Sequence, residues 1–443
     1  MRFLRRSQKR EPVFRGEITA FLALIFVLMF SLVGAHVESA SIQMARNRKR
    51  ADMVLALESA FAEYDKEMLE EYDLFVRNGC SEAVLENRLE YYGVTNMTHS
   101  VQKMERLTDH SGSPFREQAI HYAKDWFGTD ATMPDAEYEF YSETYLEEEE
   151  LVYMDMQELL AQDEKELPEE GNPLASVQRL KNTDFITLVY PNPEELSSRS
   201  ITVEHLPSGR KLETGNWGER ATEEKTDKLF LAAYLTQHFS NLMDTKESRA
   251  LLYEQEYLLS GYPSDKENME KVCKQILSIR MVANYTYLLA DSVKQAEAEA
   301  LALTLCSLLT VPGITEVVKH ALLLGWAYGE SIVDVRVLLK GKKVPAIKTA
   351  DAWQLQLANL VNLGTDKEMV SELDAPGGLG YQSYLTGLLL MENKELLSMR
   401  SLDLIESNLH IKTDECMTKI EIQSNAVHRR GVKDSFTSTF GYQ

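Results

Sequence analysis

Two carboxylates, Glu330 and Asp334, lie four residues apart in the stretch EVVKHALLLGWAYGESIVDVRVLLKG, whose apolar residues predict a helix. Residues at this spacing share one face of a helix, and paired carboxyl groups can carry out general acid–base chemistry. No histidine, metal set or nucleophile matches the pair. We therefore expect both carboxylates on the solvent-exposed face of an amphipathic helix. The alternative is a membrane-tethered extracytoplasmic enzyme or ligand-binding module with its cleft around them.

An acidic run between residues 135 and 170 could suggest calcium binding, since it holds fifteen Asp and Glu residues against one basic residue. Its spacing is not that of an EF-hand loop, and the glycine that such a loop requires is missing. Aromatic and aliphatic residues interleave the acidic ones. The run therefore predicts a long, solvated acidic helix rather than a metal site.

The cysteines also argue against metal or disulfide chemistry. Cys80, Cys273, Cys306 and Cys416 lie far apart, without Cys-x-x-Cys or Cys/His ligand spacing, so we expect single buried thiols and no internal disulfide. The chain also lacks a phosphate-binding glycine loop and the common hydrolase, metalloprotease and SxxK motifs. The sequence therefore offers no catalytic residue, metal site or cofactor site, and favours a non-enzymatic protein.

The elements that position these residues begin with a long apolar segment. The 20 residues from Ile18 to Val37 carry no charge, and a helix of that length spans roughly 30 Å, the thickness of a hydrocarbon layer. Signal-peptide apolar regions are shorter, about 7–15 residues, although Val33-Gly34-Ala35 is a weak cleavage site. The segment predicts a single transmembrane anchor, with removal as a signal peptide as the alternative.

Charge predicts the orientation of this span and the kind of partner. Six Lys and Arg residues precede it and four follow closely, which favours a cytoplasmic N-terminus and an extracytoplasmic body. The formal net charge is −22 despite a basic leader at 1–17. An acidic body argues against binding nucleic acid and against lying flat on an anionic membrane surface. We expect a cell-membrane protein whose partners are other membrane proteins.

The helical pattern continues beyond the predicted membrane span. No Pro or Gly interrupts the chain from residue 35 to residue 78, which predicts an amphipathic spine helix over 38–79. Its apolar stripe consists of Met53, Leu57, Phe61, Tyr64, Met68, Tyr72 and Phe75. Either the protein's own helices or a helix of another subunit must cover this stripe. We take Met53, Leu57 and Phe61 as the interface with a partner helix.

The remaining pattern predicts an α+β fold that is predominantly helical. β-branched runs suggest a strand near 95–109, a small sheet within 184–217 and a closing hairpin over 416–442. Pro312-Gly313 should separate two apolar helices. The predicted regions are a basic cytoplasmic leader at 1–17, the transmembrane helix at 18–37, the spine helix at 38–79, a mixed α/β region with the acidic helix at 80–218, a helical body at 219–412 and a C-terminal hairpin at 413–443.

Three parts of the chain carry a family resemblance. They are GEITAFLALIFVLMFSLVGAHVESA with RADMVLALESAFAEYDKEMLEEYDLF, YEQEYLLSGYPSDKENMEKVCKQILSIRMVANYTYLL, and LLLGWAYGESIVDVRVLLKGKKVPAIKTADAWQLQL. They resemble an uncharacterised family of membrane-anchored bacterial proteins, common in clostridial-type genomes and found near tight-adherence (Tad) pilus genes. The N-terminal part in turn looks like minor pilins or pseudopilins. The resemblance implies a pseudopilin-like or accessory component of a Tad-like pilus or secretion apparatus, with pilus-assembly proteins as partners.

The pilin resemblance also implies a leader that a prepilin peptidase removes between Gly16 and Glu17. Pilin precursors usually carry Gly at the cleavage site and Glu five residues later. Gly16 matches the first requirement, whereas Phe21 occupies the second position and Glu17 follows the glycine directly. The match to the processing signal is therefore partial.

Overall fold

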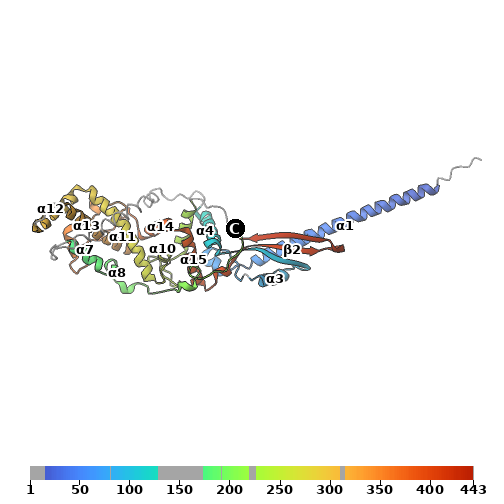
Figure 1. Cartoon of the computed structure of the whole chain (residues 1–443), viewed down its shortest axis with the longest axis horizontal. Coiled ribbons are helices and arrows are strands. Elements are labelled where there is room, and N and C mark those ends of the chain that lie inside the picture. Colours follow the sequence, from blue (N-terminus) through green and yellow to red (C-terminus); the bar gives the residue numbers. More distant parts are fainter. Residues whose placement is uncertain are drawn as a thin grey trace, which may run out of the picture. The chain divides into compact units, whose positions relative to one another are not determined.

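The computed structural model describes residues 15–79, 81–127, 173–190, 192–218, 226–309 and 315–442. The acidic run predicted between residues 135 and 170, Cys80 and most of the basic leader lie outside these residues. Within them the fold is α+β and predominantly helical, as predicted (Figure 1).

The chain forms two compact units, one of which is inserted into the sequence of the other. The spine unit takes in the chain up to Tyr64, then Arg77–Met104 and Met417–Tyr442. The body unit consists of Asp65–Val76 and Glu105–Cys416. The long apolar helix and the C-terminal hairpin therefore belong to the same unit, although most of the chain lies between them in sequence.

The spine unit contains two helices and a three-stranded antiparallel sheet: α1 (Arg15–Phe61), α3 (Glu82–Tyr91), β1 (Met97–Arg106), β2 (Met417–Val427) and β3 (Lys433–Gly441). The strand order is β1-β2-β3, and the β2–β3 register places Ile420 opposite Phe440. Buried and more exposed residues largely alternate along β2, which is typical of a strand with one face on a core. The predicted strand near 95–109 and the closing hairpin are confirmed.

α1 ends at Phe61, so the spine helix predicted over 38–79 is too long. Distant side chains of the spine unit bind its last carbonyl groups. Arg77 Nε donates to the Ala60 carbonyl at 3.0 Å, and the Tyr442 hydroxyl donates to the Phe61 carbonyl at 2.5 Å. These donors take the place of the backbone N–H groups that a continuing helix would supply.

A separate short helix, α2 (Lys66–Tyr72), follows in the body unit. Asp65 caps its N-terminus, because the carboxylate accepts a hydrogen bond from the Met68 N–H at 3.0 Å. Asp73 ends it in a left-handed conformation, with φ of 52°. The helical periodicity of the sequence is thus real on both sides of residue 62, but it belongs to two helices.

The body unit is helical. Its further helices are α4 (Asp109–Phe127), α7 (Pro173–Asn182), α8 (Phe185–Val189), α9 (Asp227–His238), α10 (Glu254–Ser260), α11 (Asp265–Ala290), α12 (Ser292–Leu309), α13 (Thr315–Leu339), α14 (Tyr381–Met391) and α15 (Lys394–Leu409). α11 and α12 both pack against α13, which is buried on all sides from residue 321 to residue 339 apart from half-buried Arg336. A helix that is apolar around its circumference is expected in such a central position. α12 and α13 are the two helices predicted on either side of Pro312-Gly313.

The small sheet predicted within 184–217 is wrong. The apolar run DFITLV contains α8, which packs against α13, and 3₁₀ turns follow at Pro193–Glu195 and Val203–His205. Among the described residues of this stretch, an isolated bridge from Ser200 to Ser264 represents β pairing. Burial against a long helix overrides the strand preference of Ile and Val here, and Pro193 has no N–H for a ladder.

Candidate functional site

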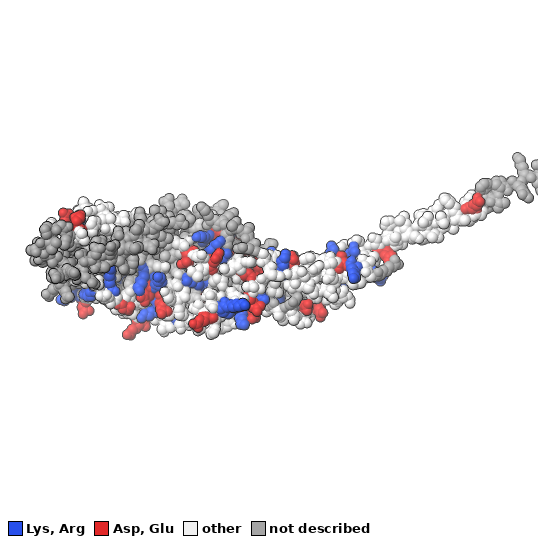
Figure 2. All heavy atoms as spheres, in the orientation of Figure 1, with Lys and Arg blue, Asp and Glu red and all other residues white. Residues whose placement is uncertain are grey.

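The N-terminal half of α1 is uncovered apolar surface. An 18-residue window of this helix has a mean hydropathy of 2.6, and none of it is buried against the described chain. Figure 2 shows a long stretch of α1 without charged side chains. The helix is long and apolar enough to cross a membrane, and an N-terminal signal sequence passes the same test.

Gly16 and Glu17 lie in the first turn of α1, and both are exposed. A Cβ atom added to Gly16 would meet nothing within 4 Å. Phe21, which stands where pilin precursors carry Glu, exposes 63% of its surface. Leader cleavage between Gly16 and Glu17 stays a prediction.

Met53, Leu57 and Phe61 lie inside the spine unit, where each exposes at most 1% of its surface. They form one apolar cluster with residues of α3 and the sheet, and the centroid of the Phe61 ring lies 4.8 Å from that of Phe440. The hairpin formed by β2 and β3, together with α3, therefore covers these three side chains. The prediction that a partner helix covers them is wrong.

Another face of α1 stays uncovered beyond the predicted membrane span. Met44, Val54 and Leu55 expose 72%, 45% and 61% of their surfaces. Leu55 and Leu57 therefore stand two residues apart on one helix with opposite environments. If α1 meets a partner outside the membrane, the structure offers these exposed side chains rather than Met53 and Leu57.

The rest of the predicted stripe belongs to the body unit or the chain leading into it. Met68 and Tyr72 are fully buried in the body core. Arg249 donates to the Tyr72 hydroxyl, and the Asn408 amide donates to the same oxygen at 2.8 Å. Phe75 is 38% exposed. The prediction of one seven-residue stripe on a single helix is thus wrong, because the chain distributes these side chains between two helices and two cores.

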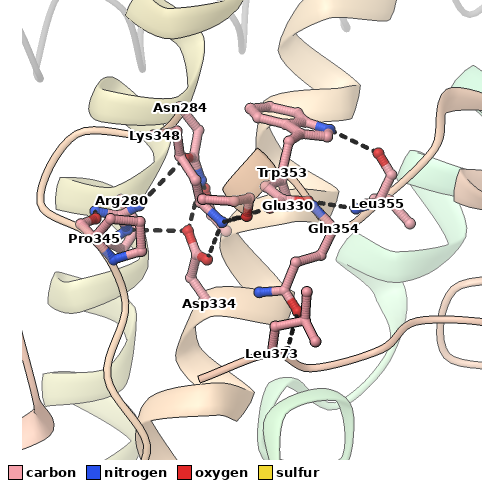
Figure 3. Close-up of polar contacts among 12 residues, drawn as sticks. Arg280, Asn284, Glu330, Asp334, Pro345, Lys348, Trp353, Gln354, Leu355 and Leu373 are labelled. Carbon is pink, nitrogen blue, oxygen red and sulfur yellow. Dashed lines mark hydrogen bonds and ion pairs between the residues drawn. The ribbon is translucent and has the colours of Figure 1, made fainter. Parts of the chain in front are cut away.

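Glu330 and Asp334 are completely buried, so the wet helix face predicted for them is wrong. Both reach towards Lys348, which lies in the segment after α13 and is itself buried (Figure 3). Lys348 Nζ lies 2.5 Å from Glu330 Oε1 and 2.7 Å from Asp334 Oδ1. The carboxylates stay inside the body unit because a cation from a neighbouring segment compensates them.

Arg280 on α11 adds a second positive charge to the cluster. Its Nε donates to Asp334 Oδ2 at 3.0 Å, and its Nη1 donates to the carbonyls of Pro345 and Ala346 at 2.9 and 3.0 Å. The Asn284 amide also donates to Asp334 Oδ2, at 2.9 Å. Two cations thus face two carboxylates, and the buried cluster is neutral when all four groups are ionised.

The segment that follows Lys348 closes over Glu330 (Figure 3). The backbone N–H groups of Gln354 and Leu355 donate to the Glu330 carboxylate, with the shortest contacts at 3.0 and 2.7 Å. The indoles of Trp326 and Trp353 both donate to the Leu355 carbonyl at 2.7 Å. Backbone donors and aromatic rings therefore surround this carboxylate.

The two carboxylates differ in how readily they take up a proton. Burial raises the pKa of Glu330, although Lys348 acts in the opposite direction. Burial alone would also raise the pKa of Asp334, but Arg280 and Lys348 together hold that pKa below its usual range. Glu330 is therefore the better proton acceptor of the pair, and Asp334 is the more firmly ionised carboxylate.

Arg280 and Lys348 were not among the residues predicted from the sequence. Arg280 continues the buried stripe of Met269, Cys273 and Ile276 at helical spacing, so a charge stands where the pattern requires an apolar side chain. That interruption was a usable signal of a buried ion pair. Lys348 carried no comparable signal, since it lies in an irregular segment outside the helical pattern.

The described residues contain no group of three or more His, Cys, Asp or Glu side chains that could hold a metal ion. Cys273, Cys306 and Cys416 are buried, as predicted. Burial raises the pKa of the Cys273 thiol far above its ordinary value. Burial therefore opposes reaction of the Cys273 thiol.

Comparison with known proteins identifies a family for this chain but no activity. Residues 163–427 match a family of unknown function, DUF5702. This match covers most of the body unit, including the buried cluster around Lys348, and extends through β2. No curated protein and no solved structure matches the chain.

Proposed function

The chain belongs to the DUF5702 family, and because the function of that family is unknown, we propose a role that rests on α1. The protein is a non-enzymatic, single-pass membrane protein of the cell surface, with a cytoplasmic N-terminus and an extracytoplasmic body. It serves as a pseudopilin-like or accessory component of a Tad-like pilus or secretion apparatus, with other membrane or pilus-assembly proteins as partners.

The observation that carries this proposal is the division of α1 into two halves. Its N-terminal half is apolar and uncovered, whereas Met53, Leu57 and Phe61 in its C-terminal half pack against the sheet of the spine unit. A helix of this kind can hold a folded unit at a membrane surface while its apolar half lies in the hydrocarbon layer. The resemblance of the N-terminal stretch to minor pilins supports the same arrangement.

The buried charges of the body support the non-enzymatic part of the proposal. The ionised atoms of Glu330, Asp334, Lys348 and Arg280 contact one another and the backbone, inside a core closed by aromatic side chains. Charges that are completely buried and paired with one another are not accessible to a substrate from solution. No observation favours a second function strongly enough to propose it.

Orientation can be tested with single engineered cysteines. Val427→Cys places a thiol on the hairpin at a residue that is 67% exposed, and Ser7→Cys places one in the basic leader. In a Cys80→Ser background, a membrane-impermeant maleimide should label Val427→Cys in intact cells and Ser7→Cys only after lysis. The reverse pattern, or labelling of both only after lysis, contradicts the proposed topology.

Anchoring is tested by extraction and by the N-terminal residue of the mature chain. The protein should stay in the membrane pellet at alkaline pH and should begin before Ile18. A start at Glu17 supports processing as a pilin, and a start at Met1 indicates a plain anchor. A start at His36 shows that the apolar helix is removed as a signal sequence, which rules out the anchor.

Partnership is tested on the exposed face of α1. Leu55→Asp should reduce co-purification of other membrane proteins with the detergent-solubilised chain while the spine unit stays folded, because Leu55 contacts solvent in this structure. Glu58→Gln is a matched control that removes one charge from an exposed position nearby on the same helix. Equal recovery of partners with Leu55→Asp and with the unmodified chain speaks against a partner at this face.

A further inference from the structure

Lys348 and Asp334 make an unusual contact for an ion pair. Their side chains are completely buried, and Lys348 Nζ lies 2.7 Å from Asp334 Oδ1. Oδ1 nevertheless accepts no hydrogen bond from any described residue. The nitrogen thus lies against the carboxyl group between two completely buried side chains, at a contact without the geometry of a hydrogen bond. Figure 3 shows Lys348 between Glu330 and Asp334.

The other oxygen of Asp334 is held firmly. Oδ2 accepts hydrogen bonds from Arg280 Nε at 3.0 Å and from the Asn284 amide at 2.9 Å. Two fixed donors on one oxygen stabilise the negative charge that develops there when a nucleophile adds to the carboxyl carbon. Asp334 therefore has one oxygen prepared to carry charge and another that is free to leave.

Glu330 supplies the third group that amide formation requires. Its Oε1 lies 2.5 Å from Lys348 Nζ, within direct reach for proton transfer. Burial raises its pKa, so it accepts a proton from the ammonium group more readily than an exposed carboxylate would. A general base in contact with the amine converts a buried ammonium group into a nucleophile.

We propose that Lys348 and Asp334 condense to an intramolecular isopeptide bond, with Glu330 as the proton carrier. Lys348 Nζ passes a proton to Glu330, Glu330 delivers it to Asp334 Oδ1, and the neutral amine attacks Cγ of the resulting carboxylic acid. A second proton follows from nitrogen to Oδ1 by the same route. The Nζ–Cγ bond forms, the Cγ–Oδ1 bond breaks, one water molecule leaves, and Glu330 returns to its starting state. No oxidant, reductant or cofactor takes part.

The charges of the site agree with this product. Condensation removes one positive and one negative charge, and Arg280 and Glu330 remain as one cation and one anion. The new bond links α13 to the segment that carries Lys348, and a cross-link of this kind stabilises a protein mainly by restricting its unfolded chain. Burial favours the amide over hydrolysis, because the site is shielded from bulk water.

The test is a peptide map of the full chain, purified in detergent, denatured and digested with trypsin. In an unlinked chain, trypsin cuts after Lys348 and leaves a free VPAIK peptide. In the linked chain, that cut is blocked, and HALLLGWAYGESIVDVR is joined to VPAIKTADAWQLQLANLVNLGTDK with the loss of one water molecule. Recovery of the branched peptide supports the bond, and recovery of the two linear peptides alone overturns it.

Two comparisons make the assignment specific. Glu330→Gln keeps the shape of the side chain but cannot carry the proton, so bond formation should slow by about 10²–10⁴-fold. Lys124 is an internal control, since it lies 2.6 Å from Asp227 Oδ1 in a partly exposed pair. Trypsin should cut normally after Lys124 in the same digest. A branched peptide that forms equally fast in Glu330→Gln removes Glu330 from the mechanism and overturns the proposal.

Discussion

The Tyr381 hydroxyl donates a hydrogen bond of 2.8 Å to Glu256 Oε1, deep in the body unit. The Leu242 N–H donates to the same oxygen at 3.0 Å. The second carboxyl oxygen, Oε2, is buried and accepts no hydrogen bond from any described residue. Burial and nearby Asp265 raise the pKa of Glu256 from its ordinary value of 4.5 to about 7, against the effect of the two hydrogen bonds. Glu256 is therefore a carboxyl group that the fold holds in its neutral form under mildly acidic conditions.

This carboxyl group should make the stability of the body depend on pH. Because the folded pKa is above the unfolded pKa, folding takes up a proton between these values, and stability falls as pH rises from about 4.5 to about 7. The loss amounts to about 3 kcal/mol at neutral pH. Glu256→Gln imitates the neutral form, so it should raise the free energy of unfolding above pH 7 and leave it nearly unchanged near pH 4.5.

Urea unfolding of the detergent-solubilised chain at several pH values measures this effect. Glu247→Gln is the matched control, because the Glu247 side chain is 81% exposed in its contact with Arg199. If Glu256→Gln and Glu247→Gln give the same pH profile, Glu256 is not the titrating group.

Removal of Arg280 should destabilise the body strongly. Arg280→Met deletes the guanidinium that binds Asp334 and leaves the buried cluster with an excess of negative charge. Breaking a buried pair in this way typically costs about 3–5 kcal/mol. Lys412→Met, which removes a surface partner of Glu415, should cost less than about 1 kcal/mol. Similar unfolding midpoints for the two variants would refute the structural role of Arg280.

The two faces of α1 should respond in opposite ways to a charge. Leu57→Asp places an unpaired carboxylate in the core of the spine unit and should open its sheet, at a cost of several kcal/mol. Leu55→Asp, on an exposed part of the same helix, should change stability by less than about 0.5 kcal/mol. Protease digestion of the hairpin measures the opening. Equal resistance in both variants would show that the hairpin does not cover Leu57.

The core thiols should be unreactive in the folded protein. Cys273 and Cys416 expose none of their surface, and burial opposes formation of the Cys273 thiolate. A maleimide reagent should therefore modify both residues only after denaturation. Mass spectrometry of the alkylated peptides measures this, with the engineered Val427→Cys thiol as the reactive control. Rapid modification of Cys273 at neutral pH would contradict its placement in the core.

The sequence pattern predicted those helices and strands whose residue types and spacing indicate them directly. Alternation along Met417–Val427 indicated β2, and the apolar runs on either side of Pro312-Gly313 indicated α12 and α13. The end of α1 could not be predicted in the same way. The donors that satisfy its last carbonyls are Arg77 and Tyr442, and Tyr442 lies far along the chain.

The site shows the same limit. Their spacing correctly predicted that Glu330 and Asp334 share one face of a helix. The prediction that this face is exposed to solvent is wrong, because both residues are completely buried. Burial of a carboxylate depends on whether a cation reaches it, and the cations come from Lys348 and from Arg280 on another helix. A single sequence does not show which distant residues meet. The charged interruption of an apolar stripe at Arg280 was the nearest available clue.

The insertion of the body unit between β1 and β2 has a consequence for biogenesis. α1, α3 and β1 are translated first, but β2 and β3, which complete the cover over Leu57 and Phe61, are translated only after residues 105–416 of the body unit. A long flexible loop between β1 and β2 would impose an entropic cost of closure. The folded body removes much of that cost, because the Leu107 N–H binds the Cys416 carbonyl at 2.9 Å and brings the ends of the insertion together. The sheet of the spine unit is therefore completed only after the body unit has been translated, and a body that fails to fold leaves Leu57 and Phe61 on α1 without the hairpin that covers them.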